Sequence, residues 1–233
     1  MPTTAPKPEG GERVLAPAGT HIGRVYRFMN LGTRFQEYQG KTKDYPDTLI
    51  NITWELPTEL HEFTKKSEDG TETTIEKPVV VSREFTLSMG SKSNLRPIVE
   101  GIIGATLKDE EAYNFDLEQL VGMASLVTIS HKESQSNGKV YANVISTAPL
   151  VKGMEAPTPV NETEIFDVNT ATQEEIEALP QFLKDKIYVS DEYKDRFDRA
   201  TAEKRAEIQE EINKRRGVEP EQSEEINPED IPF

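Results

Sequence analysis

The chain has 233 residues and a formal net charge of −15 at pH 7, with 42 acidic against 27 basic side chains. It contains no cysteine, which excludes disulfides and thiolate metal sites. No stretch approaches the roughly eighteen apolar residues of a membrane-spanning helix, and the polar start of the chain is not typical of a signal peptide. We therefore expect a soluble intracellular protein without a membrane partner. Only 35% of the residues are hydrophobic, so part of the chain should lie outside any core.

Three strand-like segments come first, at residues 21–31, 48–56 and 79–89. In the second segment, apolar side chains alternate with polar ones, which is typical of a strand with one buried face. We expect Trp54 on that buried face. The stretch between the second and third segments, residues 57–77, is mostly polar, and we expect it to form an exposed excursion.

A helix and a hairpin follow these strands. Apolar residues at helical spacing predict a helix from about Leu95 to Ile103, capped by Ser93 or Asn94. One or two short helices are expected within residues 108–120, with Asp116 as a cap. Strand character returns at residues 123–132 and 140–145, and the Asn137-Gly138 dipeptide between them predicts a tight hairpin turn.

This order of elements favours a mainly β fold with a helical extension. Five strands with a helix between the third and fourth is the arrangement of the OB-fold, a small barrel that often binds oligonucleotides. Another small five-stranded α+β domain is the alternative. The predicted organisation is a lead at residues 1–18, the OB-fold domain at 19–152, a linker at 153–168, a charged helical segment at 169–216 and a disordered acidic tail at 217–233.

The charged helical segment has two expected parts. A short helix is predicted at residues 173–179, capped by Thr170 or Thr172. A long charged helix is predicted from Ser190 to about Arg216, stabilised by ion pairs between residues four apart. The sequence leaves open whether this helix carries the tail away from the barrel or lies across it.

Catalytic motifs are incomplete. The Gly40-Lys41-Thr42 stretch imitates the end of a phosphate-binding loop, but Phe35 stands where that motif requires glycine. The His61-Glu62 pair opens like a zinc-protease helix, but Lys65 occupies the position of the second histidine ligand. We therefore predict a protein that is not an enzyme and needs no metal or cofactor.

Basic and aromatic side chains gather in the first strand and the loop after it. Single-stranded DNA presents flat bases and a phosphate track, so aromatic platforms interleaved with cations suit it. The residues predicted to bind DNA are Arg24, Tyr26, Arg27, Arg34, Phe35, Tyr38, Lys41, Lys43 and Tyr45. Tyr26 and other strand aromatics could instead be core, whereas Phe35, Tyr38 and Tyr45 lie in a polar loop and are the better stacking candidates.

The last seventeen residues, 217–233, contain six acidic side chains and no Lys or Arg. They end on Asp230-Ile231-Pro232-Phe233, which resembles the acidic tip of bacterial single-stranded DNA-binding proteins. In that family the tip recruits replication, recombination and repair proteins. The resemblance implies such partners here. The binding residues would be Glu229, Asp230, Ile231, Pro232 and Phe233. An acidic end that binds nothing is the alternative.

The chain as a whole resembles bacteriophage single-stranded DNA-binding proteins. The resemblance covers about residues 19–152, through stretches such as ITWEL at 52–56 and FTLSM at 85–89, together with the tip. It implies sequence-independent coating of single strands during phage replication or recombination in the cytoplasm of the infected host cell. The charged segment stands where bacterial relatives have a Gly/Pro/Gln-rich linker, so the oligomeric state stays open. The alternative function is a protein-interaction module whose tip mimics that of the host protein and competes for its partners.

Overall fold

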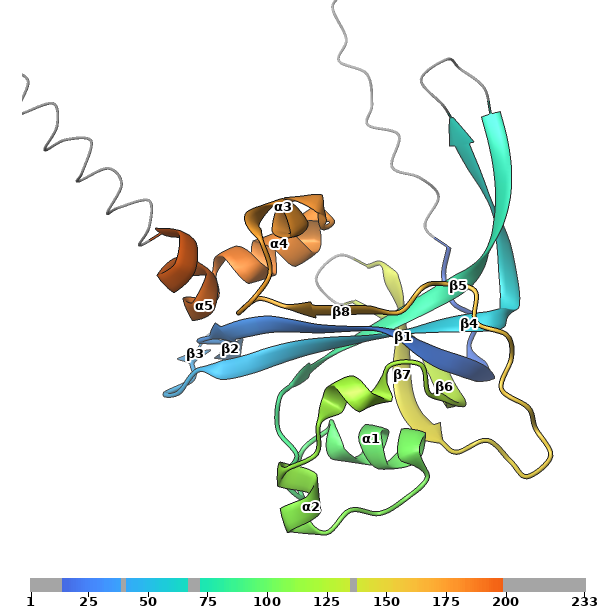
Figure 1. The fold of residues 1–233 in the computed structure, drawn as a ribbon, viewed down its shortest axis with the longest axis horizontal. Coiled ribbons are helices and arrows are strands. Elements are labelled where there is room, and N and C mark those ends of the chain that lie inside the picture. Colours follow the sequence, from blue (N-terminus) through green and yellow to red (C-terminus); the bar gives the residue numbers. More distant parts are fainter. Residues whose placement is uncertain (1–13, 39–40, 67–71, 135–137, 199–233) are drawn as a thin grey trace, which may run out of the picture.

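The computed structural model describes residues 14–38, 41–66, 72–134 and 138–198, and they form a mainly β fold (Figure 1). Five long strands build one antiparallel sheet, and a short sixth strand is attached to it. The strands of this sheet are β1 (Gly19–Arg34), β4 (Asp47–Lys66), β5 (Glu72–Thr86), β6 (Ala124–Glu133), β7 (Val140–Ala148) and β8 (Glu164–Asp167). Two short strands, β2 (Glu37–Tyr38) and β3 (Lys41–Thr42), form a separate hairpin between β1 and β4.

The strand order is β5-β4-β1-β6-β7, so the first strand lies between the second and fourth long strands of the chain. Strand β8 pairs with β1 in parallel. The sheet is open: within the described residues, no backbone ladder joins its two end strands, β5 and β7. The closed five-stranded barrel that the sequence predicted is therefore not shown. One side-chain contact crosses the opening, where Arg83 Nη1 of β5 donates to Val144 O of β7 at 2.6 Å.

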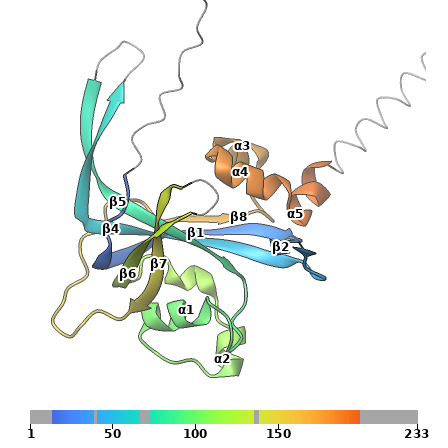
Figure 2. The ribbon, with the colours of Figure 1, turned by 180° about the vertical axis from the view of Figure 1, so that it is seen from behind.

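Strands β4 and β5 continue well beyond the sheet as a twisted two-stranded arm (Figures 1 and 2). Their pairing runs from Leu49 opposite Thr86 to Lys66 opposite Glu72, with one irregularity after Leu56. Residues 57–77, predicted as an exposed excursion, thus do project from the sheet, but most of them do so as paired strands. The sequence of this stretch is mostly polar, and Thr58, Leu60 and Glu62 are exposed.

The main core fills the side of the sheet on which α1 (Arg96–Ile103) lies. Trp54 is fully buried there, as predicted from its alternation with polar residues. Pro97 stands in the first turn of α1, where proline is tolerated, and Arg96 N donates to Ser93 Oγ at 3.1 Å. Two more short elements follow, α2 (Asp109–Tyr113) and a 3-10 turn (Leu117–Leu120) capped by Asp116 as predicted. The predicted hairpin between the last two long strands is confirmed by the pairing of β6 with β7.

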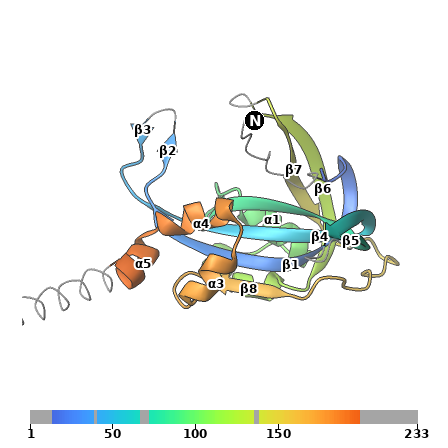
Figure 3. The same cartoon turned by 90° about the horizontal axis from the view of Figure 1, so that it is seen from above.

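A C-terminal layer covers the opposite side of β1, as Figures 1 and 3 show. It consists of β8, α3 (Gln173–Ala178), α4 (Gln181–Tyr188), α5 (Asp191–Tyr193) and a π-helical turn (Lys194–Asp198). A second core joins this layer to the sheet; it contains Met29, Leu31, Leu49, Phe166, Val168, Ala171, Ile176, Leu183 and Ile187. Strand β1 is therefore apolar on both faces, because each face meets a different core.

This layer bears on two predictions. Residues 164–167, predicted to be part of a linker, form β8 and bury Phe166. The short helix predicted at residues 173–179 is confirmed as α3 with Thr172 as its cap, and the described helices after it pack against the sheet, which the sequence had left open. The predicted flexible lead is ordered at its end, because Ala16 is buried in the main core. The remainder of the predicted long helix, after residue 198, lies outside the described residues.

Candidate nucleic-acid interface

The nine residues predicted to bind DNA fall into separate environments, and Arg24 is the most deeply buried of them. It is 4% exposed, and its Nε donates to Glu55 Oε1 at 2.6 Å. Glu55 is 0% exposed and also accepts from Asn161 N and Nδ2, at 2.8 and 2.7 Å. The predicted phosphate contact requires an exposed side chain, and Arg24 is buried because its register partner on β4 is the carboxylate of Glu55. Arg24 is therefore not part of the candidate interface.

The other strand residues meet the C-terminal layer. Arg27 Nη1 lies 3.6 Å from Glu164 Oε2 of β8. Arg34 Nη1 donates to Lys186 O of α4 at 2.7 Å, and its Nη2 lies 3.8 Å from Glu84 Oε1. Partial burial raises the pKa of Tyr26. These side chains help to hold the C-terminal layer against the sheet, so they do not form the exposed basic strand that we expected.

The loop residues Phe35 and Tyr45, by contrast, are well exposed, at 56% and 64%. Lys43 Nζ lies 5.8 Å from the centroid of the Tyr45 ring, within the range of a cation–π contact. Tyr38 and Lys41 pair in the backbone of the β2–β3 hairpin, and their side chains lie outside the described residues. The structure thus brings Lys43 and Tyr45 together, and exposes Phe35 in the same connection between β1 and β4.

Asp47 organises this loop. It is buried, and its Oδ2 accepts hydrogen bonds from Gln36 Nε2, at 2.8 Å, and from Lys43 Nζ. The backbone closes the same turn, because Lys43 N donates to Gln36 O at 2.9 Å. The hydrogen bond to Asp47 raises the pKa of Lys43. The charge of Lys43 therefore neutralises the Asp47 carboxylate, and the bonds among Gln36, Lys43 and Asp47 fix the loop on which Tyr45 lies.

A cleft of about 770 Å³ opens beside Tyr45, between this loop, the end of β5 and the segment before α1. Its side chains are mostly polar, and they include residues that the sequence did not single out as binding candidates: Arg83, Leu87, Ser88, Lys92, Ser93 and Asn94. Leu87 follows the last residue of β5 and is 43% exposed. The polar Ser91–Asn94 stretch between strand and helix was the only available signal.

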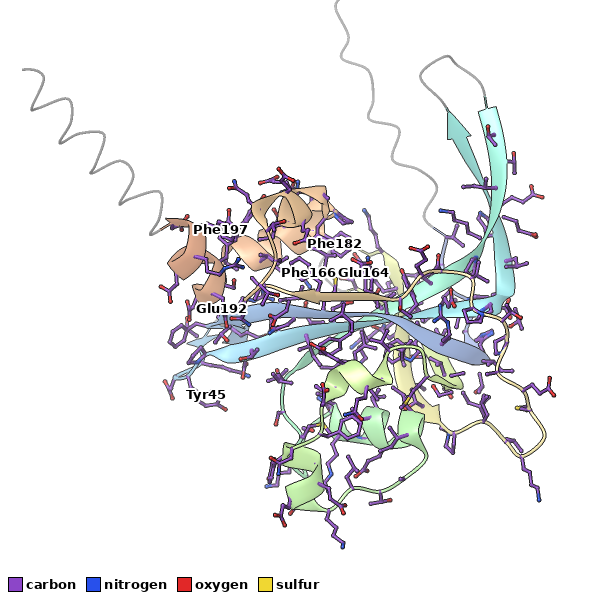
Figure 4. The ribbon with its side chains drawn as sticks, in the orientation of Figure 1. Tyr45, Glu164, Phe166, Phe182, Glu192 and Phe197 are labelled. Atoms are coloured by element: carbon purple, nitrogen blue, oxygen red, sulfur yellow. The ribbon has the colours of Figure 1, made fainter. Side chains whose placement is uncertain are left out.

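Figure 4 shows labelled aromatic residues on two different parts of the molecule. Tyr45 lies at the end of the sheet near β2 and β3, whereas Phe182 and Phe197 lie on the C-terminal helices. Phe182 is 61% exposed, close to the value for Tyr45. It therefore offers a matched exposed aromatic residue that does not line the cleft.

No group of three or more potential metal-ligating side chains gathers within the described part of the chain. None of the described helices is long and apolar enough to cross a membrane. No protein-family model matches the sequence, and no curated protein matches it significantly. The predicted tip residues, Glu229, Asp230, Ile231, Pro232 and Phe233, lie outside the described residues.

Proposed function

We propose that the chain is a non-enzymatic protein that binds single-stranded DNA with little sequence preference, in phage replication or recombination in the cytoplasm of the host cell. The observation that carries this proposal is the exposure of Phe35 and Tyr45 on one loop, with Lys43 against the Tyr45 ring. Exposed rings contribute little to a hydrophobic core, whereas each ring can stack on a base for about 1–3 kcal/mol.

The strand order supports an OB-fold variant. An OB-fold barrel also places its first strand between the second and fourth, and its third and fifth strands meet to close the barrel. In this chain Arg83 bridges those two strands through its bond to Val144 O. Oligonucleotides bind OB-folds on the second and third strands and on the loop between the first and second. Here these are β4, β5 and the loop that carries Phe35 and Tyr45.

The outer face of β4 is closed to DNA in this arrangement, because Glu55 is buried against Asn161. The proposed interface is therefore restricted to the loop between β1 and β4 and the adjoining end of β5. The Asp-Ile-Pro-Phe tip completes the proposal: as in bacterial single-stranded DNA-binding proteins, it would recruit replication, recombination or repair proteins.

The test is fluorescence anisotropy with a labelled poly-dT oligonucleotide and the full-length protein at low salt. We expect saturable binding, with duplex DNA of the same length a poorer competitor than unlabelled poly-dT. The Phe35→Ala, Tyr45→Ala double variant should bind at least tenfold more weakly, because two stacking contacts are lost. The Phe182→Ala variant, which removes an equally exposed ring from α4, is the control and should bind like the parent.

Failure to bind poly-dT at low salt, or tighter binding to duplex, would overturn the proposal. If pull-down of a host replication protein through the tip persisted in that case, the protein-interaction alternative would take its place.

A further inference from the structure

The cleft beside Tyr45 is built from three short segments that the fold fixes independently. Asp47 anchors the loop wall through Gln36 and Lys43. The floor is the end of β5, tied to β4 where Leu87 N donates to Thr48 O at 2.8 Å. The far wall is the turn before α1, closed where Ser93 N donates to Gly90 O at 2.9 Å. The cleft is therefore a formed feature of the fold.

The cleft combines apolar surfaces with hydrogen-bonding groups. Tyr45 and Leu87 give it two exposed apolar surfaces. Hydroxyl and amide groups of Ser88, Ser93 and Asn94 provide donors and acceptors between them. A flat ring with polar edges, such as a nucleobase, matches this combination, because its faces need stacking partners and its edges need hydrogen bonds. The volume of about 770 Å³ lies within the range of small-ligand sites.

The charges in the cleft also favour a nucleotide. Its two carboxylates are already paired: Asp47 with Lys43, and Glu84 with Lys186 of α4. Lys92 is exposed and forms no hydrogen bond or ion pair with any other residue that the structure describes. Arg83 also lines this cleft; its Nη1 donates to Val144 O at 2.6 Å, and partial burial lowers its pKa. The positive charge that these two side chains bring to the cleft suits a phosphate group.

We infer that this cleft holds one unstacked nucleotide of the bound strand, with its base between Tyr45 and Leu87 and its phosphate at Lys92. The inference rests on the proposed function and makes it more specific, because it assigns the residues of β5 and of the turn before α1 to DNA recognition. Simple stacking on the loop would need only Phe35 and Tyr45. A nucleotide seated in the cleft also needs Leu87, Lys92 and open space at Ser88.

Two variants test the cleft without touching the loop aromatics. Lys92→Ala removes the exposed cation, and Ser88→Trp places a large ring in the opening; both positions are exposed, so the fold should tolerate the changes. Their matched controls are Lys152→Ala and Thr158→Trp, at exposed positions in the connection between β7 and β8. The measurement is poly-dT anisotropy with the full-length protein at one fixed low salt concentration.

The same proteins are then cross-linked to an oligonucleotide that carries 5-iododeoxyuridine, and the adduct is located by mass spectrometry. We expect Lys92→Ala and Ser88→Trp to weaken poly-dT binding at least fivefold, the two controls to change it less than twofold, and the parent adduct to lie on Tyr45. Ser88→Trp should also reduce that adduct severalfold.

The outcomes separate the two proposals. If the parent binds poly-dT while both cleft variants bind as it does, the cleft assignment is overturned and the proposed function stands; an adduct confined to Phe35 has the same meaning. If the parent does not bind poly-dT at all, both are overturned.

Discussion

Replacing Glu55 by Met should destabilise the protein strongly. Its buried carboxylate accepts hydrogen bonds from Arg24 Nε at 2.6 Å, Asn161 N at 2.8 Å, Asn161 Nδ2 at 2.7 Å and Val160 N at 3.3 Å. After the change, the Arg24 guanidinium keeps only Asn161 O as a partner among the described residues. Removing one partner of a buried pair and leaving the other charged costs about 3–5 kcal/mol.

Replacing Arg24 by Met should lower the free energy of unfolding by less. In Arg24→Met, the carboxylate of Glu55 keeps three N–H donors from Val160 and Asn161, and the loss of one charged hydrogen bond costs about 1.5–3 kcal/mol. The double variant, with Met at both positions, leaves no buried charge behind, and such replacements are often close to neutral. Its loss should therefore be smaller than the sum of the two single losses by about 2 kcal/mol or more.

Urea unfolding followed by fluorescence measures these differences directly. Trp54 is the single tryptophan of the chain and is fully buried, so its emission reports the loss of the main core. With a slope of about 2 kcal/mol per M of urea, the Glu55→Met midpoint should fall by about 1.5–2.5 M while the slope stays constant. If the free energy of unfolding fell by less than about 1 kcal/mol, or if the losses added strictly in the double variant, Glu55 and Arg24 would not be an energetically coupled buried pair.

Three further predictions address other parts of the chain. Ile176→Ala, in the fully buried centre of the second core, should lower the free energy of unfolding by about 2–5 kcal/mol in the same urea assay and leave the poly-dT affinity of the folded protein unchanged. Hydrogen bonds from Thr172 N and from its hydroxyl lower the pKa of Glu175, so this contribution to stability is complete at neutral pH and is lost as pH falls through the folded-state pKa; Thr172→Ala keeps the backbone donor and removes the hydroxyl, so it should reduce that acid-side loss without abolishing it in a pH series of unfolding curves. Truncation after Arg216 removes six acids and no base, so it should raise poly-dT affinity modestly at low salt, whereas deletion of Phe233 alone should leave affinity unchanged and abolish pull-down of a host replication protein.

The elements that sequence reasoning found are those with a local signal. Trp54 alternates with polar neighbours, Thr172 stands before a helical run, and the Asn137-Gly138 turn lies between two strand-like segments, so each could be assigned without knowledge of the rest of the fold. The sequence did not predict the β4–β5 arm as paired strands, because its apolar residues, Leu60, Phe63 and Ile75, are too sparse among polar ones to give a period of hydrophobicity.

The candidate site was harder to predict, because spacing along a strand does not show what covers it. The sequence placed Arg24 and Arg27 in one basic cluster with the loop residues, but Arg24 meets Glu55 only through the register of β1 against β4. Arg27 meets Glu164 only because a distant strand pairs in parallel with β1. Strand β8 itself has four residues, and the burial of Phe166 depends entirely on that pairing. Neither contact leaves a signal in a single sequence.

These pairings decide how an acidic chain could hold DNA. Carboxylates in or beside the C-terminal layer pair with Arg24, Arg27 and Arg34, and Asp47 pairs with Lys43, which leaves Arg83 and Lys92 at the cleft. If these two cations meet phosphates, the slope of log affinity against log salt is about −1.4, so affinity should fall about sevenfold between about 50 and 200 mM salt. The five bases of the originally predicted cluster would give a slope of about −3.5 and a fall of more than about a hundredfold. A salt titration of poly-dT binding therefore distinguishes the two interfaces, and a fall near the larger value would mean that the C-terminal layer leaves the sheet when DNA binds. The smaller value requires stacking on Phe35 and Tyr45 to supply most of the affinity, which is the arrangement that their exposure favours.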